Sequence, residues 1–453
     1  MCYNIFKFIC YRQLPDVRRK DMSQISINTV AKEMKETSAF FAATSETMRN
    51  EALLAIRDAL IKHKDAIFAA NKEDLKNAKA NAIPEAVIKR LKFDEHKLGD
   101  VVSGITNLCG LSDPVGRVLL KRELDEGLVL VRQSCPIGVI GVIFEARPDA
   151  LVQISTLCIK SGNCAILKGG SETLNTNKMI FDIIHAAAVK AGLPKRCLYQ
   201  VEARSDIDEL LSCYRYVDLL IPRGSNAFVQ YIMNHTKIPV MGHADGICHI
   251  YVDAAADIEK TIPVVVDAKI QYTAACNAAE TLLVHRQIAA AFLPALAEAY
   301  EKCGVTIRGT SEVAGIIPCE PASDADFSTE YLDLVISVKL VDNMEEAIEH
   351  INRYGSHHTD AIMTEDDAAA EQFMELVDSA GVYQNCSTRF ADGFRYGFGA
   401  EVGISTSKLH ARGPVGLDGL VTYKYKLYGR GQIVGDYASG KSAFHFKDLP
   451  LDQ

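Results

Sequence analysis

Cys276 is the residue with the clearest capacity for covalent chemistry. It lies in the segment 271–277, QYTAACN, whose small residues predict a loop between a helix and a strand. In such a loop, backbone amides can hold a negative oxygen beside the sulfur while the thiolate attacks a carbonyl carbon. Other cysteines, such as Cys158, Cys164, Cys248 and Cys303, lie in apolar contexts that are typical of a core. The residues around Cys276 leave a packing role open for it as well.

Two loops could bind phosphate or ribose, because each places a cation and glycine directly after a predicted strand. One is the segment 168–171 (KGGS), before a helix that begins near Ser171, and the other is 222–225 (PRGS). The amides of a helix N-terminus and a nearby cation together favour an anionic ligand. Ordinary βα turns with a surface base fit either segment equally well. Their occurrence in one sheet favours a ligand, although no Gly-x-Gly-x-x-Gly fingerprint follows a strand.

Hydroxyl and guanidinium groups gather in two segments near the carboxyl end, 385–390 (NCSTRF) and 403–414 (GISTSKLHARGP). Arginine binds carboxylate and phosphate groups bidentately, so these segments suit an anionic substrate. A solvated loop with surface salt bridges fits them too. The histidines match no short metal-ligand spacing, so we expect no metal site; they include His243, His249, His357, His358 and His410.

Helical and strand patterns must position these residues. After Ser45, which we expect to cap a helix, apolar residues recur at helical spacing as far as Ile67. Val118–Leu124 and Leu128–Gln133, joined by Asp-Glu-Gly, predict a hairpin. The apolar run Ile137–Phe144 predicts a strand that is buried on both faces. Further strands, with helices between several of them, are expected near Cys164–Leu167, Tyr199–Val201, Leu219–Ile221 and Ile238–Met241.

A second cycle of strands and helices follows and continues to about Val382. Its first members are the predicted strand His249–Val252, helix Asp257–Lys269, strand Glu280–Val284 and helix Gln287–Lys302. Strands that alternate with helices predict parallel βαβ units, so we expect two α/β domains in tandem. The tail Leu420–Phe446 alternates β-forming residues around glycines. It predicts a second hairpin, paired with the first one or with another subunit.

The composition excludes several classes of function. The 453 residues are 48% hydrophobic and 24% charged, which is the profile of a globular chain of two or three domains. A net charge of −9 argues against a nucleic-acid partner, and no apolar run is long enough to span a bilayer, so we expect no membrane partner. Thirteen scattered cysteines suggest neither a disulfide framework nor a zinc ribbon. This cysteine pattern is more typical of reduced thiols in a cytoplasmic protein.

Seven runs of sequence are similar to the gamma-glutamyl phosphate reductases, a branch of the aldehyde dehydrogenase superfamily that acts in proline biosynthesis. They follow one another in consistent order between about Asn28 and Gly435 and read PIGVIGVIFEARPDA (136–150), KSGNCAILKGGSE (160–172), MGHADGICHIYVD (241–253), CNAAETLLVH (276–285), YGSHHTDAIMTED (354–366), NCSTRFADGF (385–394) and GAEVGISTSKLHARGPVGL (399–417). The resemblance implies an α/β, aldehyde dehydrogenase-like fold. It would have a Rossmann-like cofactor domain, a catalytic α/β domain and a small β flap for oligomerisation.

The resemblance also implies domain boundaries. Residues 1–21 would be an N-terminal extension. The cofactor-binding domain would take 22–117 and 135–253, with a return segment at about 387–418. The catalytic domain would be 254–386, and the β flap would combine 118–134 with 419–453.

The resemblance assigns the reaction centre residue by residue. Cys276 matches the nucleophile of the family, and backbone amides together with Asn277 would hold the oxyanion. The substrate would be L-glutamyl 5-phosphate, reduced through a cysteine thioester to glutamate 5-semialdehyde and phosphate. Candidate groups for binding its carboxylates or phosphate are Arg147, His243, Ser387, Thr388, Arg389 and Arg412.

The implied cofactor is NADPH/NADP. Lys168 matches the superfamily lysine that contacts the adenosine ribose. Ser171 stands where NAD-preferring relatives often carry glutamate, and loss of that carboxylate removes a repulsion toward a 2′-phosphate. Gly224 and Ser225 match the turn that contacts the pyrophosphate, and Glu330 matches the acid that holds the nicotinamide ribose.

One departure from the wider superfamily concerns hydrolysis. Hydrolytic aldehyde dehydrogenases carry a glutamate general base in a Glu-Leu-Gly-Gly segment, and here that segment reads His-Ala-Asp-Gly at 243–246. A hydrolytic enzyme needs this carboxylate to activate water against the thioester. A reductase that passes its thioester to hydride should avoid hydrolysis, so the loss is in the expected direction. We favour a structural or substrate role for His243 over a role as replacement base.

Two other interpretations remain open at this stage, and each can be tested. One is a hydrolytic or CoA-acylating aldehyde dehydrogenase, which would not require phosphate in the oxidative direction. The other is a catalytically silent relative of the same fold, which would not consume NADPH. For the reductase, the resemblance implies glutamate 5-kinase as the pathway neighbour and a homo-oligomer, either dimer or tetramer.

Overall fold

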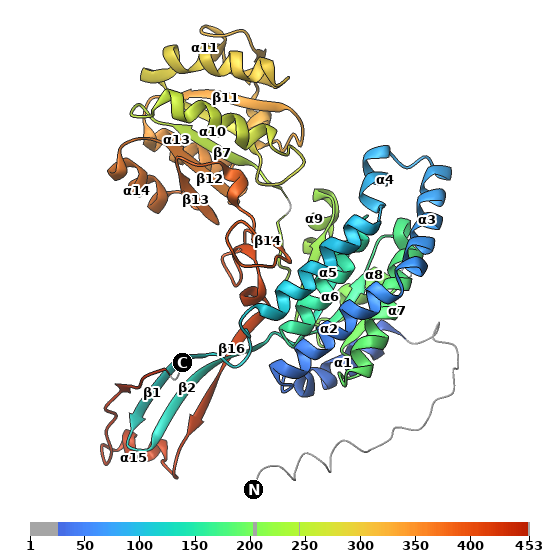
Figure 1. Cartoon of the computed structure of the whole chain (residues 1–453). Coiled ribbons are helices and arrows are strands. Elements are labelled where there is room, and N and C mark those ends of the chain that lie inside the picture. The colour runs from blue at the N-terminus through green and yellow to red at the C-terminus, as the bar shows by residue number, and fades with distance from the viewer. Residues whose placement is uncertain (1–25, 203–205, 244, 452–453) are drawn as a thin grey trace.

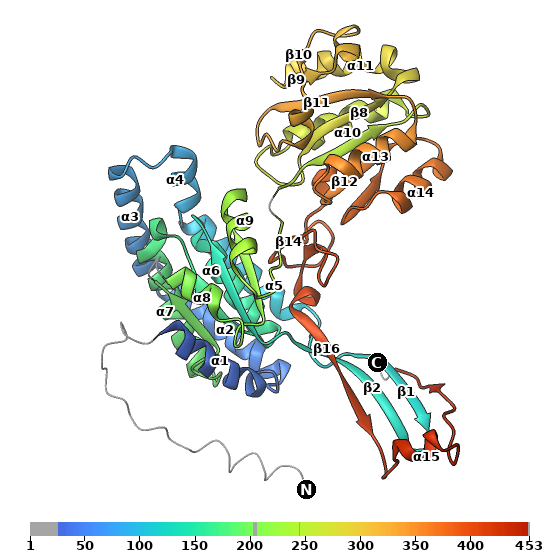
Figure 2. The ribbon, with the colours of Figure 1, turned by 180° about the vertical axis from the view of Figure 1, so that it is seen from behind.

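The computed structural model describes residues 26–202, 206–243 and 245–451. These residues form two parallel β-sheets covered by helices, an antiparallel sheet that extends away from them, and a two-stranded ladder, β14 (Gly403–Ser405) with β15 (Gly413–Val415) (Figure 1, Figure 2). The two α/β units predicted from the alternating pattern are therefore present. The predicted extension 1–21 lies outside the described residues. No helix in the described part of the chain is long and apolar enough to cross a membrane.

The first parallel sheet has the strand order β5-β4-β3-β6, and its strands are Leu198–Val201, Cys164–Lys168, Val139–Phe144 and Leu219–Arg223 in that order. β3 and β4 are buried along their whole length, which explains their continuous apolar sequences. The expected strand near Ile238–Met241 is wrong: Val240 forms a single bridge to Leu220. The connecting and following helices are α6 (Pro148–Lys160), η2 (Ser171–Thr173), α7 (Leu174–Lys190), α8 (Asp206–Ser212) and α9 (Asn226–His235).

Five N-terminal helices cover this sheet and its crossover helices: α1 (Ile27–Phe41), α2 (Glu46–Lys62), α3 (Lys64–Ala80), α4 (Glu85–Leu91) and α5 (Glu95–Gly110). α2 contacts α5, α6 and α7, and its apolar stripe, which includes Leu53, Ile56 and Leu60, is fully buried. Ser45 caps α2 as predicted, because its hydroxyl accepts a hydrogen bond from the backbone N–H of Met48 at 3.2 Å.

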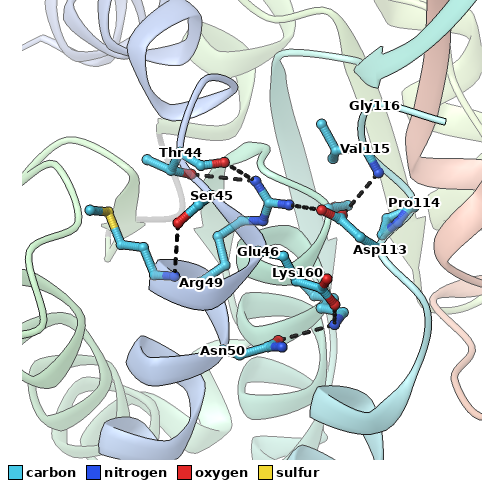
Figure 3. A network of polar contacts seen from close by, with 12 residues as sticks. Thr44, Ser45, Glu46, Arg49, Asn50, Asp113, Pro114, Val115, Gly116 and Lys160 are labelled. Carbon is cyan, nitrogen blue, oxygen red and sulfur yellow. Dashed lines mark hydrogen bonds and ion pairs between the residues drawn. The ribbon is translucent and has the colours of Figure 1, made fainter. Parts of the chain in front are cut away.

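A buried polar network ties α2 to α6 and to the segment after α5 (Figure 3). The Arg49 guanidinium, whose side chain is 1% exposed, pairs with Asp113 at 2.6 Å. Nearby, the Lys160 ammonium donates to Glu46 at 2.9 Å and to Asn50 at 3.0 Å. The Lys160 hydrogen bond holds the pKa of Glu46 below its ordinary value. Buried charges of this kind stabilise a fold only while both partners are present.

The second parallel sheet has the strand order β10-β9-β11-β8-β7-β12-β13. Its strands in that order are Glu320–Pro321, Thr306–Gly309, Val335–Val341, Ala279–His285, Cys248–Val252, Thr359–Met363 and Gly381–Gln384. The predicted members of the second cycle agree with it to within a residue or two. Its helices are α10 (Ile258–Ile270), α11 (Arg286–Lys302), α12 (Ser311–Ala314), η3 (Asp324–Ser328), α13 (Met344–Tyr354) and α14 (Asp367–Leu376).

The antiparallel sheet is built on the predicted hairpin, β1 (Val118–Asp125) and β2 (Leu128–Pro136), which turns at Gly127 with φ +69°. The tail pairs with the first hairpin, which was one of the two predicted alternatives, but the prediction that the tail itself forms a hairpin is wrong. β16 (Val421–Tyr428) pairs antiparallel with β2, the residues after it form the short helix α15 (Val434–Ala438), and β17 (Lys447–Asp448) pairs with β1. The strand order is therefore β16-β2-β1-β17.

The chain returns from the second sheet to the first before it enters β16. The helical turn η4 (Thr388–Phe390) and the β14–β15 ladder are followed by η5 (Leu417–Leu420). Side chains of this segment join the hydrophobic core of the first sheet, namely Ala400, Val402, Val415, Leu417 and Leu420. This packing supports the proposed return segment, while the domain boundaries themselves stay a prediction.

Candidate active site

Cys276 lies in the turn between α10 and β8, and its thiol is partly exposed. The loop after His243 runs against this turn: a Cβ on Gly246 would lie 2.0 Å from the Cys276 carbonyl oxygen, so the close approach requires glycine. Other cysteines differ, because burial raises the pKa of Cys158 and Cys197 to about 12. Thiols with such pKa values stay protonated and inert at neutral pH.

The structure places the other predicted core cysteines as expected, with one exception. Cys158, Cys164 and Cys248 are buried, whereas Cys303 is only partly buried at the end of α11. The exception follows from its position, since the C-cap residue of a surface helix is seldom enclosed on all sides.

Asn277 and the turn η4 hold the Cys276 loop in place. The Asn277 amide nitrogen donates to the Ala391 carbonyl at 2.8 Å, and the Asn277 carbonyl accepts from the Thr388 hydroxyl at 2.7 Å. The Ser387 hydroxyl caps η4 by accepting from the N–H of Arg389 at 3.3 Å. Asn277, Ser387 and Thr388 thus act within the protein to position the loop, and their direct roles toward substrate stay predictions.

Two arginines lie close enough to the thiol to interact with it. Arg223 and Arg389 both interact electrostatically with Cys276, and burial lowers the pKa of each guanidinium. Arginine nevertheless remains a cation in proteins. Arg223 donates to the Val402 carbonyl at 2.9 Å, and Arg389 donates to the Gln271 side chain at 2.9 Å. The sequence interpretation had assigned Arg389 to the substrate but had treated Arg223 only as part of a phosphate-binding turn.

The other predicted arginines are placed differently. Arg147 is exposed at the N-cap of α6. Arg412 is exposed and pairs with Asp378 at 2.9 Å, and it lines a cavity of about 510 Å³ whose lining residues do not include Cys276. Lys408, at 2.6 Å from the same Asp378 carboxylate, holds the pKa of that carboxyl below its usual value together with Arg412.

Two histidines lie close to the thiol. One ligand atom from each of His243, Cys276 and His358 lies within 4.8 Å of the other two. His243 donates from Nδ1 to the Ile404 carbonyl at 3.0 Å, and burial lowers its pKa, which favours the neutral ring. His358 is buried beside Thr359. Sequence spacing could not indicate this group, because its members come from three distant segments.

The candidate cofactor loops meet at the carboxyl ends of β3, β4 and β6. Lys168 ends β4 and is 4% exposed, and its ammonium donates to the Gly169 carbonyl at 2.6 Å. Ser171 is exposed at the start of η2. A Cβ on Gly224 would lie 2.6 Å from a Glu145 carboxylate oxygen, so the Glu145 side chain packs directly against the backbone of this turn.

Two residues that the sequence interpretation missed connect these loops. The Glu145 carboxylate accepts from the N–H of Ser225 at 3.1 Å, at the N-terminus of α9. It stands where the resemblance puts an anionic pyrophosphate. The Asn226 amide donates to Glu330 at 2.5 Å and to Asp245 at 2.8 Å. Through this hydrogen bond, Glu330 of the second α/β unit contacts the start of α9, which follows β6 of the first sheet.

Comparisons with known proteins agree with this geometry. The family model described as "Aldehyde dehydrogenase family" matches residues 16–317. The chain is 57% identical over 431 residues to gamma-glutamyl phosphate reductase of Acetivibrio thermocellus, which covers 94% of this chain and 100% of the relative. It is 55% identical over 428 residues to the enzyme of that name from Pelotomaculum thermopropionicum, covering 94% and 99%. The crystal structure of gamma-glutamyl phosphate reductase from Thermotoga maritima is similar with a TM-score of 0.87 and 39% identity, covering 89% of this chain and 98% of that one.

Proposed function

Because the chain belongs to the gamma-glutamyl phosphate reductases of the aldehyde dehydrogenase family, we propose that it reduces L-glutamyl 5-phosphate to L-glutamate 5-semialdehyde and phosphate, with NADPH as the reductant. The observation that carries the proposal is the partly exposed thiol of Cys276, which interacts electrostatically with the partly buried Arg223 and the buried Arg389. A thiol in this setting can take an acyl group from an anionic donor.

The first half of the reaction uses groups of this chain alone. The Cys276 thiolate attacks the acyl carbon, a C–S bond forms, and the bond from carbon to the phosphate oxygen breaks. Arg223 and Arg389 interact electrostatically with Cys276 and can neutralise charge on the departing phosphate. In the turn, the N–H groups of Ala275 and Ala278 donate to carbonyls of the turn itself, so the N–H groups of Cys276 and Asn277 are the candidates for the oxyanion. The product of this half is a thioester on Cys276.

The second half needs a dinucleotide, and the loops present suit one. Lys168 supplies a cation at the end of β4, and Ser225 begins α9, whose N-terminal N–H groups suit a phosphate group. When bound, NADPH supplies hydride to the thioester carbon. The residues that would hold it are Lys168, Gly224, Ser225 and Glu330. Ser171 in place of a carboxylate supports NADPH over NADH, because it adds no negative charge near a 2′-phosphate.

The same site disfavours hydrolysis of the thioester. The described titratable side chains grouped with the Cys276 thiol are the imidazoles of His243 and His358, and neither is the carboxylate that hydrolytic relatives use. This supports the reductase over a hydrolytic aldehyde dehydrogenase.

We also propose that the chain works as a homo-oligomer joined through the antiparallel sheet. β16 is an edge strand whose side chains Tyr423, Tyr425 and Leu427 are 50%, 57% and 57% exposed. An unpaired edge with exposed aromatic residues is the usual form of a pairing surface. The acyl phosphate would come from glutamate 5-kinase, the expected pathway neighbour. A cytoplasmic location stays a prediction, supported by the free state of the described cysteines.

The reaction is tested in the oxidative direction with purified protein, glutamate 5-semialdehyde and NADP+. We expect NADP+ reduction that requires inorganic phosphate, because only an acyl-phosphate product consumes it. NAD+ in place of NADP+ should give a lower kcat/KM. Phosphate-independent turnover would instead indicate hydrolysis, turnover that needs coenzyme A would indicate the acylating alternative, and the absence of turnover with any acceptor would indicate a silent relative.

A further inference from the structure

His243, Cys276 and His358 form a cluster that the proposed reaction does not require as a whole. One ligand atom from each lies within 4.8 Å of the other two, and the two imidazole rings meet nearly edge to face, with centroids 4.9 Å apart and an interplanar angle of 81°. A thiolate with two imidazole nitrogens is the donor set that zinc prefers over hard cations such as magnesium.

On each imidazole, Nδ1 lies against an oxygen, and Nε2 is the candidate ligand for a metal ion. His243 must carry its proton on Nδ1, because the Ile404 carbonyl at 3.0 Å can only accept, so its Nε2 holds a free lone pair. His358 Nδ1 lies 2.9 Å from the Thr359 hydroxyl, and its buried Nε2 has no hydrogen-bond partner among the described residues. Metal-binding histidines usually have such an oxygen on the other ring nitrogen. A buried nitrogen without a hydrogen-bond partner destabilises the fold, and a ligand that bonds to it removes this cost.

The spacing fits zinc after a small adjustment. Ligand atoms around a tetrahedral zinc ion lie about 3.3 to 3.8 Å apart, as follows from bond lengths of about 2.0 to 2.3 Å. The separations in the cluster, at 4.8 Å or less, therefore have to shorten by at most about 1 to 1.5 Å. Cys276 can supply much of this movement, because it lies in a turn and its side chain is partly exposed, which also gives an ion a path from solvent.

We propose that His243, Cys276 and His358 bind one zinc ion, and that this ion reversibly blocks the nucleophile. On binding, the Cys276 thiol releases its proton to solvent and the sulfur forms a bond to zinc, with no change of oxidation state. Water completes the coordination. The zinc-bound sulfur cannot attack an acyl carbon. The blocking effect rests on the proposed function, whereas zinc binding does not.

Zinc binding is measured on the full-length protein by competition with a chromophoric chelator under reducing, oxygen-free conditions. We expect one tight equivalent in the wild type, its loss in Cys276→Ser, and at least about tenfold weaker binding in His358→Asn. Matched controls are Cys319→Ser and His96→Asn, which remove the same groups elsewhere and should retain the tight equivalent. Magnesium should not compete. Equal affinity in the wild type and Cys276→Ser would overturn the proposal.

Because substitution of a buried histidine can unfold the chain, a second measurement uses the unmodified protein. The rate of Cys276 alkylation by iodoacetamide is followed by mass spectrometry of its peptide. Stoichiometric zinc should slow this rate at least about tenfold and a chelator should restore it. An unchanged rate with zinc bound would refute the assignment of Cys276 as a ligand. Neither measurement depends on turnover, so failure of this proposal is distinguishable from failure of the proposed reaction.

Discussion

At the scale of single residues, the reactive thiol differs from the other cysteines by its surroundings. Cys158 and Cys197 are enclosed by hydrocarbon, and burial raises the pKa of both to about 12. Cys276 instead lies on a turn that Gly246 approaches closely, with Arg223 and Arg389 near the sulfur. Position and charge together, and not the presence of a thiol, select this residue for chemistry.

Arg389 should bind the phosphate group, whereas Arg147 should not. Arg389→Met removes a buried cation beside Cys276, and a charge-assisted hydrogen bond is worth about 1.5–3 kcal/mol. We therefore expect kcat/KM for phosphate in the oxidative assay to fall about 10- to 100-fold. Arg147→Met, at an exposed N-cap, is the matched control and should lose much less. The reverse pattern would move the phosphate site to α6.

His350 should make the fold sensitive to acid. Burial lowers its pKa to about 3, and its Nε2 has no hydrogen-bond partner among the described residues. The unfolded chain binds a proton below about pH 6.5 while the folded chain does not, so stability is present above this pH and is lost as pH falls toward 3. Between pH 7 and pH 5 the loss is about 2 kcal/mol.

The test compares urea unfolding of the wild type and His350→Gln at both pH values. The substituted chain should lose about 2 kcal/mol less between pH 7 and pH 5. His96→Gln, at an exposed position of α5, controls for removal of an imidazole as such. An identical pH dependence in the wild type and His350→Gln would show that His350 takes up its proton equally in both states.

At the scale of elements, charge pairs between helices hold the layers together. Asp113→Asn would leave the Arg49 guanidinium, which is 1% exposed, without its counter-charge (Figure 3). We expect a loss of about 3 kcal/mol in the free energy of unfolding, measured by urea denaturation. Asp58→Asn breaks the Arg57 pair, whose carboxylate is 65% exposed, and should cost less than about 0.5 kcal/mol. Equal effects would mean that Asp113 is not needed to compensate Arg49.

The order of elements followed from the sequence because each has a strong local pattern. The apolar runs of β3 and β4, the Ser45 cap and the Asp-Glu-Gly turn all depend on neighbouring residues. The tail does pair with the first hairpin, as one of the two predicted alternatives had it, but its two strands lie on opposite edges of that hairpin and do not pair with each other. Local β-forming residues cannot tell which strand each of them pairs with. Ile238–Met241 failed for a different, local reason: Pro239 lacks an N–H to donate to a ladder, and a single bridge is formed.

The part of the site that has a local sequence pattern could also be predicted. Cys276 and Lys168 stand out by type and position at a loop or strand end. His358, Asn226 and Glu145 reach the site only through the packing of distant segments, and their sequence contexts are unremarkable. The tertiary fold creates that part of the site.

At the scale of the whole molecule, the antiparallel sheet extends away from both α/β units (Figure 2). Tyr425→Lys places a charge on exposed β16, where burial against another copy would desolvate it. We expect the oligomer to dissociate, seen as a smaller mass in analytical ultracentrifugation. Tyr214→Lys, at a tyrosine that is 49% exposed outside this sheet, should leave the mass unchanged. An unaltered oligomer in Tyr425→Lys would exclude this face as the interface.

The central claim is that the acyl group passes through Cys276, and trapping the thioester tests it most directly. The protein is mixed with glutamate 5-semialdehyde and NADP+ without phosphate, quenched in acid and analysed by mass spectrometry. We predict a glutamyl adduct on the peptide that contains Cys276, which disappears when phosphate is added before quenching and never forms in Cys276→Ser. Phosphate-dependent turnover by Cys276→Ser, or an adduct on another residue, would contradict the account.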